Sequence, residues 1–333
     1  MSNKSKNIKI HLSALALLLL ALSLVLSACQ STPPAEATEV APAEPVKLKL
    51  ALLPIIDTLP ILVAQQEGLF EANNVDVEVI PVASAAERDQ VIASGQADGM
   101  INEALSTMLY NKDQTQVQIV RFARASSSEH PLFWILASST SGINSVEGLK
   151  NVEIGVSEGT IIEYITDRLL EKEGLASDEI KNLAVPKIPD RIALLCTGQL
   201  KAATLPDPAA SLARQQGAVS ILDDSKYPEL SLSTLAFRKP FIDQNSQAIK
   251  NFLKAIEAAV ERINQDPSKY TDLLVEQKVL PAPLAETFQV PPFITAGVPN
   301  EAHWNDVLAW AKAEGLFDKD ISYSESVTTQ YLP

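Results

Sequence analysis

The segment Leu50-Ala-Leu-Leu-Pro-Ile-Ile-Asp-Thr-Leu-Pro-Ile-Leu-Val-Ala64 opens with a short apolar run, turns near its proline, and then resumes an apolar pattern. A short apolar run of this kind is typical of a buried strand. The residues after Asp57 and Thr58 read as the start of a helix. That helix would end at Glu67-Gly68-Leu69, because glycine readily adopts the left-handed conformation that closes a helix. The segment therefore predicts a buried strand, a turn and a helix in immediate succession.

The same arrangement occurs a second time in Val152-Glu-Ile-Gly-Val-Ser-Glu-Gly-Thr-Ile-Ile-Glu-Tyr-Ile-Thr166. Thr160 stands where Thr58 stands in the first copy, and Glu173-Gly174-Leu175 supplies the matching end of the helix. A second strand is expected after each helix, over 75–81 in one copy and 180–185 in the other. The chain thus contains an internal repeat.

Each copy continues with a glycine-glutamine turn into a third short strand, over 97–102 and over 200–205, and then into another helix. Strand–helix–strand–helix units of this length form parallel sheets with right-handed crossovers. Two copies predict two α/β lobes, each a mainly parallel sheet flanked by helices. Ligands of such sheets bind beyond the carboxyl ends of the strands. The loops expected to meet there are 54–58, 102–106, 157–160 and 205–208.

Two crossover strands are expected to join the lobes, one following the first copy and one returning after the second. We assign 47–128 and 235–333 to lobe 1 and 129–234 to lobe 2. A long amphipathic helix over about 240–264 would follow the return. The later helices, including 301–315, are expected to pack onto lobe 1.

The N-terminus has the layout of an export signal: three lysines, an apolar stretch over 12–28, and then Cys29. Leu26-Ser-Ala-Cys29 resembles the bacterial lipobox, in which the cysteine is lipidated and becomes the first residue of the mature chain. The alternatives are a plain secretion signal and an uncleaved anchor. We expect a lipoprotein signal over 1–28, and a flexible tether over 29–46 because that stretch is rich in proline and glutamate.

The composition limits the possible partners and cofactors. The net charge is −14, and loss of the lysine-containing signal makes the mature part more acidic still, which disfavours nucleic acid and anionic lipid surfaces. The chain has two cysteines, Cys29 and Cys196, so that lipidation of the first leaves no disulfide and no thiolate zinc cluster. We expect no cofactor, no metal and a monomer.

The helix start at 157–160 offers free backbone amides to an anionic or dipolar group, and Gly159 would allow a close approach. Ordinary capping of the helix by Thr160 is the alternative reading. In lobe 1, Asp57 would repel an anion and favour a ligand with a donor; otherwise it caps its helix. Arg124, at the end of a crossing strand, could pair with an acidic ligand or form a salt bridge across the hinge.

Asn102 and Glu103 follow a strand end and belong either to the cleft or to a surface loop. Asp207 lies between two prolines, which stiffen the loop that presents it. The predicted ligand-binding residues are Asp57, Thr58, Asn102, Glu103, Arg124, Ser157, Glu158, Gly159, Thr160 and Asp207. Four acidic residues around one arginine favour a zwitterion or a neutral polar heterocycle over nitrate.

The lipobox, the segment 50–71 and Gln90-Val-Ile-Ala-Ser-Gly-Gln-Ala-Asp98 together resemble the solute-binding proteins of ABC importers. The nearest subgroup is the one for nitrate, taurine, alkanesulfonates and thiamine pyrimidine precursors. This resemblance implies the type II periplasmic-binding-protein fold, with a ligand cleft between two lobes. It also places the ligand loops at 54–60, 157–160 and 206–208.

The expected function is therefore an extracytoplasmic, lipid-anchored protein that closes over a small organic solute, such as a sulfonate, a thiamine-precursor-like compound or another polar heterocycle. Its partners would be a permease and an ATPase, with membrane contact through the lipid only. The alternatives are a sensor that does not transport and an enzyme on the same scaffold. The resemblance includes enzymes of thiamine-pyrimidine synthesis that need clustered histidine and cysteine, and this sequence has no such cluster.

Overall fold

The computed structural model describes residues 44–333. The predicted signal segment, Cys29 and most of the predicted tether lie outside the described residues. The described part enters its first strand at Val46, which pairs with Val75 of the neighbouring strand. The predicted tether thus overlaps the folded chain by one residue, because Val46 already belongs to a strand.

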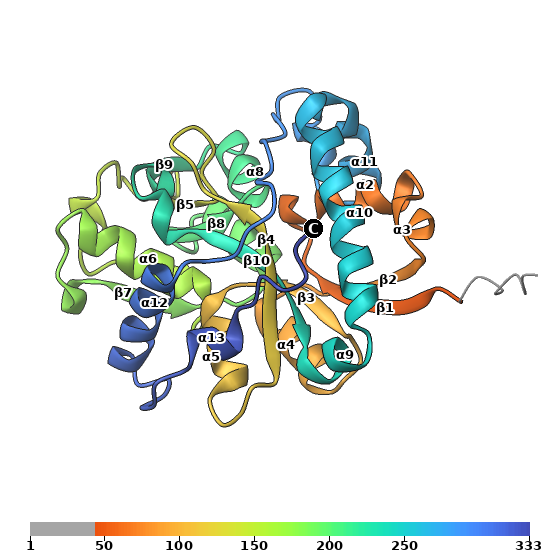
Figure 1. Ribbon diagram of the computed structural model, residues 1–333. Helices are drawn as coiled ribbons and strands as arrows, with labels where there is room; N and C mark the ends of the chain where they lie inside the picture. The colour runs from red at the N-terminus through yellow and green to blue at the C-terminus, as the bar shows by residue number, and fades with distance from the viewer. Residues whose placement is uncertain (1–43) are drawn as a thin grey trace, which may run out of the picture. The chain divides into compact units, whose positions relative to one another are not determined.

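Two five-stranded sheets form the centre of the described residues (Figure 1). The first has the order β2-β1-β3-β10-β4. Its central strands are β1 (Val46–Leu52) and β3 (Gly99–Asn102), with β2 (Val75–Pro81) parallel at one edge. β10 (Leu232–Arg238) runs antiparallel between β3 and β4 (Val117–Ala125). Only β10 reverses direction in this sheet.

The second sheet has the order β7-β6-β8-β5-β9 and follows the same plan. β6 (Glu153–Val156) lies parallel to β7 (Lys181–Ala184) and to β8 (Ala202–Pro206). β5 (Phe133–Ala137) runs antiparallel between β8 and β9 (Val219–Asp223). The prediction of two mainly parallel α/β sheets built from a repeated unit is confirmed.

The helices of the two copies correspond as well. The first copy contains η1 (Ile56–Thr58), α2 (Leu59–Gln66), α3 (Leu69–Ala72), α4 (Ala85–Ala93) and α5 (Ala104–Asn111), and the second contains α6 (Ile161–Lys172), α7 (Ile188–Cys196) and α8 (Ala209–Gln215). Gly68 and Gly174, which the sequence placed at helix ends, have φ angles of 67° and 103°. A side chain with a Cβ would be strained there, so glycine suits both turns.

The prediction of one continuous helix over 240–264 is wrong in its first turns. The structure has two helices there, α9 (Lys239–Gln244) and α10 (Ser246–Gln265). Asn245 between them has φ −130° and ψ 37°. Its side-chain amide donates to the carbonyl of Phe241 at 3.1 Å, in competition with regular helical bonding. The asparagine thus ends one helix and starts the next.

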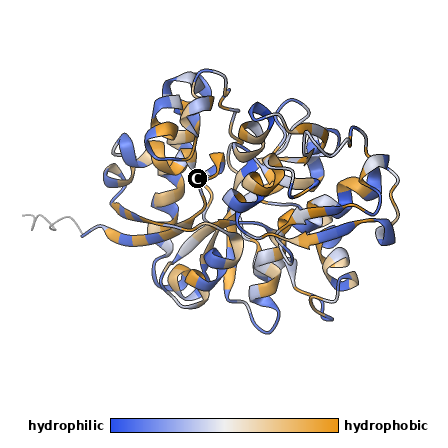
Figure 2. Cartoon of the chain, turned by 180° about the vertical axis from the view of Figure 1, so that it is seen from behind, coloured by the Kyte–Doolittle hydropathy of each residue, from blue (hydrophilic) through white to orange (hydrophobic). Residues whose placement is uncertain are grey.

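The predicted apolar face of α10 is buried, with Phe252, Ile256, Val260 and Ile263 all at most 1% exposed. This face packs on α2 and α3, and the ring of Phe252 stacks on Phe70 with centroids 5.3 Å apart. In Figure 2 the helices carry hydrophobic and hydrophilic residues side by side, as expected for helices that cover a sheet.

The remaining helices of the C-terminal part are α11 (Thr271–Glu276), α12 (Glu301–Ala313) and α13 (Tyr323–Ser326). α13 is tied to the first sheet through a bridge between Val327 and Ile119 of β4. α12 packs against α5 of the first copy and also against α6 of the second (Figure 1). It therefore connects helices that belong to different sheets.

The chain passes between the sheets twice, from β4 to β5 and from β9 to β10. The two connections are bonded to each other. The amide of Ser126 donates to the carbonyl of Ser231 at 3.0 Å, and its hydroxyl donates to Asp224 at 3.1 Å. The amide of Leu132 donates to the same carboxylate oxygen at 2.9 Å. Asp224, which is fully buried, thus holds both crossings together.

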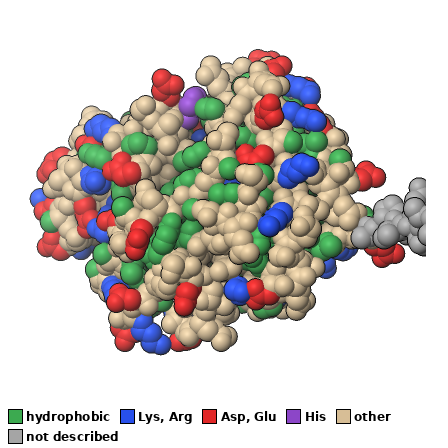
Figure 3. All heavy atoms as spheres, in the orientation of Figure 1, with side chains coloured by type: hydrophobic (Ala, Val, Ile, Leu, Met, Phe, Trp, Pro, Cys, Tyr) green, Lys and Arg blue, Asp and Glu red, His purple; other side chains and the backbone are tan. Residues whose placement is uncertain are grey.

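Acidic and basic side chains are interspersed over the face of the molecule in Figure 3. Within residues 44–333, none of the helices is both long enough and apolar enough to cross a membrane.

Candidate functional site

A cavity of about 70 Å³ is lined by residues of both halves of the fold. η1, α4, β3, β4 and β10 contribute from the half built on the first sheet, and β5, α6, α7 and the end of β8 from the half built on the second. Apolar side chains supply part of the lining, among them Phe133 and Ile162. The charged residues that line it are Asp57, Arg88, Glu103, Arg124, Arg191 and Asp207, each at most 9% exposed.

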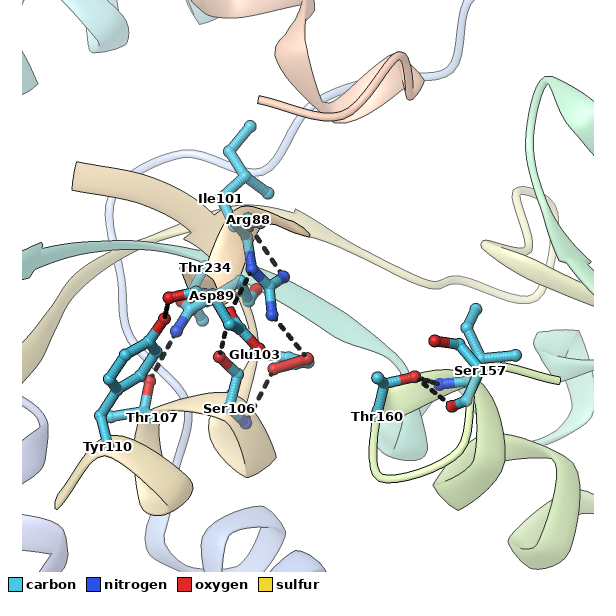
Figure 4. A network of polar contacts seen from close by, with 12 residues as sticks. Arg88, Asp89, Ile101, Glu103, Ser106, Thr107, Tyr110, Ser157, Thr160 and Thr234 are labelled. Carbon is cyan, nitrogen blue, oxygen red and sulfur yellow. Dashed lines mark hydrogen bonds and ion pairs between the residues drawn. The ribbon is translucent and has the colours of Figure 1, made fainter. Parts of the chain in front are cut away.

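Arg88 of α4 is held by acidic groups of the first copy (Figure 4). Its Nε donates to Asp89 at 2.8 Å, and its Nη2 lies 3.6 Å from an oxygen of Glu103. A further nitrogen donates to the carbonyl of Ile101 at 3.2 Å. Glu103 also accepts the amide of Ser106 at 3.0 Å and so caps α5. Two carboxylates thus balance the charge of one buried arginine, while Arg88 Nη2 and the facing oxygen of Glu103, 3.6 Å apart, form no hydrogen bond.

Burial and charge oppose each other in this cluster. Burial alone would lower the pKa of Arg88, but the nearby charges of Asp89 and Glu103 outweigh it and raise the pKa. Burial raises the pKa of Glu103, and the attraction of Arg88 only partly offsets this. Arg88 therefore remains a cation that the protein itself neutralises.

A second cluster joins Asp57 of η1 to Arg124 of β4. Arg124 Nη1 lies 3.6 Å from one oxygen of Asp57, and the hydroxyl of Ser233 on β10 donates to the other oxygen at 2.5 Å. Arg124 also donates to the carbonyl of Pro131 at 3.1 Å, in the first crossing between the sheets. Both carboxylate oxygens of Asp57 thus contact side chains of the cavity wall, and Arg124 extends from the cavity to the crossing between the sheets.

Two more predicted residues line the cavity: Asn102 at the end of β3, and Asp207 directly after β8. Asn102 donates to Thr107 at 2.8 Å and accepts from Thr234 at 2.8 Å, which fixes its amide. Asp207 accepts from the amide and the hydroxyl of Ser211 at 3.0 and 2.8 Å. Burial raises the pKa of Asp207, and these hydrogen bonds partly offset the rise.

Six of the ten predicted binding residues therefore meet at the cavity: Asp57, Asn102, Glu103, Arg124, Ser157 and Asp207. The other four do not line it. Thr58 donates to the carbonyl of Ile55 and lines a separate groove. Glu158 is exposed, and the amide of Gly159 donates to Glu163 at 2.6 Å. Thr160 caps α6 by accepting the amide of Ile162, as the alternative reading of this turn predicted (Figure 4).

The sequence analysis missed Arg88 and Arg191, both on helices, and Ser233 on β10. Arg191 lies on α7 and is 1% exposed, and its Nε and Nη1 atoms have no hydrogen-bond partner among the described residues. Burial lowers its pKa to about 10. The internal repeat held the available signal, because Arg88 and Arg191 each precede a Gly-Gln pair by six intervening residues, at Gly95 and Gly198.

Within the described range, side chains of histidine, cysteine, aspartate and glutamate form no group of three suited to a metal ion. No described histidine or cysteine lines the cavity. Its chemistry is that of buried arginines, carboxylates and hydroxyls, which bind polar and charged groups through hydrogen bonds.

Comparison with known proteins gives one curated relative and several structures. The relative is a Haemophilus influenzae protein named for thiamine biosynthesis, which is 25% identical over 230 residues, or 67% of this chain and 70% of the relative.

The alkanesulfonate-binding protein SsuA of Xanthomonas axonopodis pv. citri, solved with MOPS, has a TM-score of 0.73 at 17% identity and covers 86% of this chain and 99% of its own. The nitrate-binding protein NrtA of Synechocystis PCC 6803 has a TM-score of 0.69 at 14% identity, covering 86% and 87%. The desulfurization enzyme DSZB also shares the fold, with a TM-score of 0.64 at 11% identity over 86% of this chain and 97% of DSZB. At these identities the likeness establishes the two-lobed binding-protein fold, as predicted, and leaves the ligand open.

The family resemblance drawn from the sequence is also confirmed. Residues 55–270 match the family described as NMT1/THI5 like. The matched range holds both crossings between the sheets and all six charged residues that line the cavity. The chain therefore belongs to the NMT1/THI5-like family.

Proposed function

We propose that the protein is the solute-binding component of an ABC importer, which encloses a small polar organic solute between its two halves and delivers it to a permease. The observation that carries the proposal is the cavity itself. Charged side chains from both halves are buried around it, and burying charge is costly unless a partner is gained. The solved relatives named for binding sulfonate and nitrate support the same role.

The lobes in this proposal are 47–128 with 235–333, and 129–234. Closure would take place about the two crossings held by Asp224, and the closed form would be what the permease recognises. We place the protein outside the cytoplasmic membrane as a monomer, anchored by lipid at Cys29. The proposed binding residues are those that line the cavity.

The test is thermal unfolding followed by circular dichroism with a panel of sulfonates, nitrate, amino acids, pyrimidines and flavins. A solute present at 100 times its dissociation constant adds about 2.7 kcal/mol to the free energy of unfolding, which raises the melting temperature by several degrees. Mass spectrometry of extracts from the purified protein looks for a solute that is already bound. Failure of every compound together with an empty extract would contradict the proposal.

The anchor is tested separately. In bacteria fed a labelled fatty acid, the protein should take up label and enter the membrane fraction, whereas Cys29→Ser should do neither. A labelled Cys29→Ser protein would place the lipid elsewhere.

Enzymatic function on this scaffold is the second candidate, because DSZB shares the fold. The expected requirement for clustered histidine and cysteine applies to the enzymes of thiamine-pyrimidine synthesis, and among the described residues no histidine or cysteine lines the cavity. Turnover of a bound solute by the purified protein would favour this candidate.

A further inference from the structure

The two copies of the repeat place an arginine at the same position. Arg88 on α4 and Arg191 on α7 each follow the second strand of their copy, and each stands the same distance before a Gly-Gln pair. Both are at most 4% exposed, and both line the same cavity. The fold thus directs two equivalent guanidinium groups toward one space, one from each half.

The two arginines differ in what surrounds them. Arg88 has Asp89 beside it in sequence and Glu103 at the end of the next strand, at 2.8 and 3.6 Å. In the second copy Ile192 follows Arg191, and Asp190, which precedes it, is exposed. Among the described residues, neither Asp190 nor any other carboxylate forms a salt bridge with Arg191, whereas Arg88 forms two. Burial alone accounts for its lowered pKa, whereas the pKa of Arg88 is raised by its acidic neighbours.

An unpaired buried guanidinium is unfavourable, because it loses its hydration without gaining hydrogen bonds. Its planar set of donors matches a carboxylate, a sulfonate or a phosphate, which it binds through two parallel hydrogen bonds. The two nitrogens without a partner, Nε and Nη1, lie on different edges of the guanidinium, and each can form a parallel pair of hydrogen bonds together with Nη2. Arg191 and Ser157 line the same cavity, and an acidic group bound there would supply the hydrogen-bond acceptors that Arg191 lacks.

We propose that Arg191 binds the acidic group of the solute, and that the solute is therefore an organic acid or zwitterion bearing a carboxylate, sulfonate or phosphate. Arg88 is a structural counterpart already neutralised by the protein. This inference rests on the proposed solute-binding function and names the class of solute. The inference assigns Arg191 to the binding site as a second cation, whereas the sequence analysis predicted Arg124 as the single arginine among four acidic residues.

The first experiment needs no solute and compares Arg191→Met with Arg88→Met. Each protein is unfolded in guanidinium chloride and refolded, so that any bound compound is removed, and its melting temperature is measured. Loss of Arg88 leaves Glu103 and Asp89 without their cation and should lower the melting temperature by several degrees. Loss of an unpaired cation should leave the melting temperature of Arg191→Met at or above that of the wild type. A fall like that of Arg88→Met would make Arg191 structural and overturn the proposal.

The second experiment uses pairs of compounds that differ only in the acidic group. The pairs are MOPS with N-(3-hydroxypropyl)morpholine, taurine with ethanolamine, and 4-amino-5-hydroxymethyl-2-methylpyrimidine phosphate with its unphosphorylated form. We expect an acidic member to stabilise the wild type where its neutral partner does not. Arg191→Met should weaken that binding at least about 30-fold, because a buried charged contact is lost. Arg191→Lys should keep part of it, and Asp190→Asn, an exposed change on the same helix, should keep all of it.

The outcomes separate the two proposals. Equal binding of the neutral member, or full binding by Arg191→Met, would overturn the role of Arg191 and leave the solute-binding function standing. A solute extracted from the wild type that lacks an acidic group would do the same. Failure of every probe together with an empty extract would overturn the solute-binding function itself.

Discussion

At the scale of single residues, Arg124 shows how one side chain joins the cavity to the crossing between the sheets. It lies near Asp57 in the cavity wall and donates to the carbonyl of Pro131 in the first crossing. The carboxylate of Asp57 depends on Arg124 and on the hydroxyl of Ser233. Removal of either charge, that of Arg124 or that of Asp57, should therefore leave the other buried without its ionic partner and destabilise the protein.

We predict that Arg124→Met lowers the free energy of unfolding by about 3 kcal/mol, because it leaves Asp57 buried with one hydroxyl as its partner. Asp57→Asn in the same protein should recover much of that loss. A double-mutant cycle by urea denaturation measures the coupling between them. Additive losses would mean that the 3.6 Å contact contributes nothing. Asp243→Asn, at an exposed surface position, serves as the control.

Gly99 in β3 is the second residue-scale case. A Cβ at this position would lie 2.4 Å from the ring of Phe237 and 2.9 Å from Leu50, and both neighbours are fully buried. Gly99→Ala should lower the free energy of unfolding by about 1–3 kcal/mol, through overpacking in a filled core. Gly99→Ala combined with Phe237→Leu should regain part of this loss. A Gly99→Ala protein as stable as the wild type would contradict the packing.

Sequence reasoning reached the site residues that follow a strand directly. Asn102, Glu103 and Asp207 stand at strand ends, where the topology alone brings them to the cavity. Arg88 and Arg191 stand inside helices, and only their long side chains reach the cavity, so position along the chain did not reveal them. Which turn amides remain free also depends on local bonds, such as the one from Gly159 to Glu163.

At the scale of elements, α6 and α12 are joined by polar contacts that run from one copy of the repeat to the C-terminal part. Tyr164 donates to Asp306 at 2.7 Å, and Arg168 pairs with the same carboxylate at 3.2 Å. The indole of Trp310 donates to Asp167 at 3.0 Å. Burial raises the pKa of Asp167 to about 6, and the charges of nearby acids add to the rise while hydrogen bonds oppose it.

We predict that Asp167→Asn stabilises the protein at pH 8. Because the pKa of Asp167 is higher in the folded state, its contribution is complete below the unfolded value of 3.8 and is lost as pH rises through about 6. The loss amounts to about 3 kcal/mol, and the uncharged amide avoids it. Asn182, which donates to Asp167, has an oxygen without a partner, so a turned amide could accept from the new residue.

Urea denaturation of the wild type and Asp167→Asn at pH 4, 6 and 8 checks this. The difference between the two should be largest at pH 8 and should nearly vanish at pH 4. Asp178→Asn, at an exposed position, should show no such trend. A variant less stable than the wild type at pH 8 would show that the ionised carboxylate is needed by its partners.

Periodicity located most elements, since buried strands and amphipathic helices carry strong patterns. It failed at Asn245, where a side-chain bond to the carbonyl of Phe241 breaks a helix whose pattern continues. It also gave no sign that α12 would contact both copies, because contacts between distant elements depend on which surfaces remain uncovered.

At the scale of the whole molecule, the internal repeat explains why the fold was predictable. Two copies with the same strand order force two similar sheets, and each then receives one antiparallel strand next to its third parallel strand, β10 in one and β5 in the other. The way these halves are held together depends on a few bonds at the crossings. Asp224, which the sequence analysis did not single out, is central to them.

We predict that Asp224→Ala loosens the crossings. The amide of Leu132 loses its acceptor, so its hydrogen exchange should become at least about tenfold faster, since a bond to a charged group is worth more than 1.4 kcal/mol. Exchange of amides in β1 should not change. Ser225→Ala, the neighbouring substitution, should leave Leu132 protected. Unchanged exchange at Leu132 in Asp224→Ala would show that other contacts hold the crossing.

The placement of α12 gives the molecule an optical reporter of its own. The three tryptophans are Trp134, Trp304 and Trp310, and all are buried. Trp310 alone among them bonds through its indole to a carboxylate of α6, whereas Trp304 bonds to the carbonyl of Ile321 in the C-terminal part. Any motion that draws α6 from α12 must break the Trp310 contact and shift its emission. The intrinsic tryptophan fluorescence of the unlabelled protein would then report whether α6 and α12 separate when a solute is added.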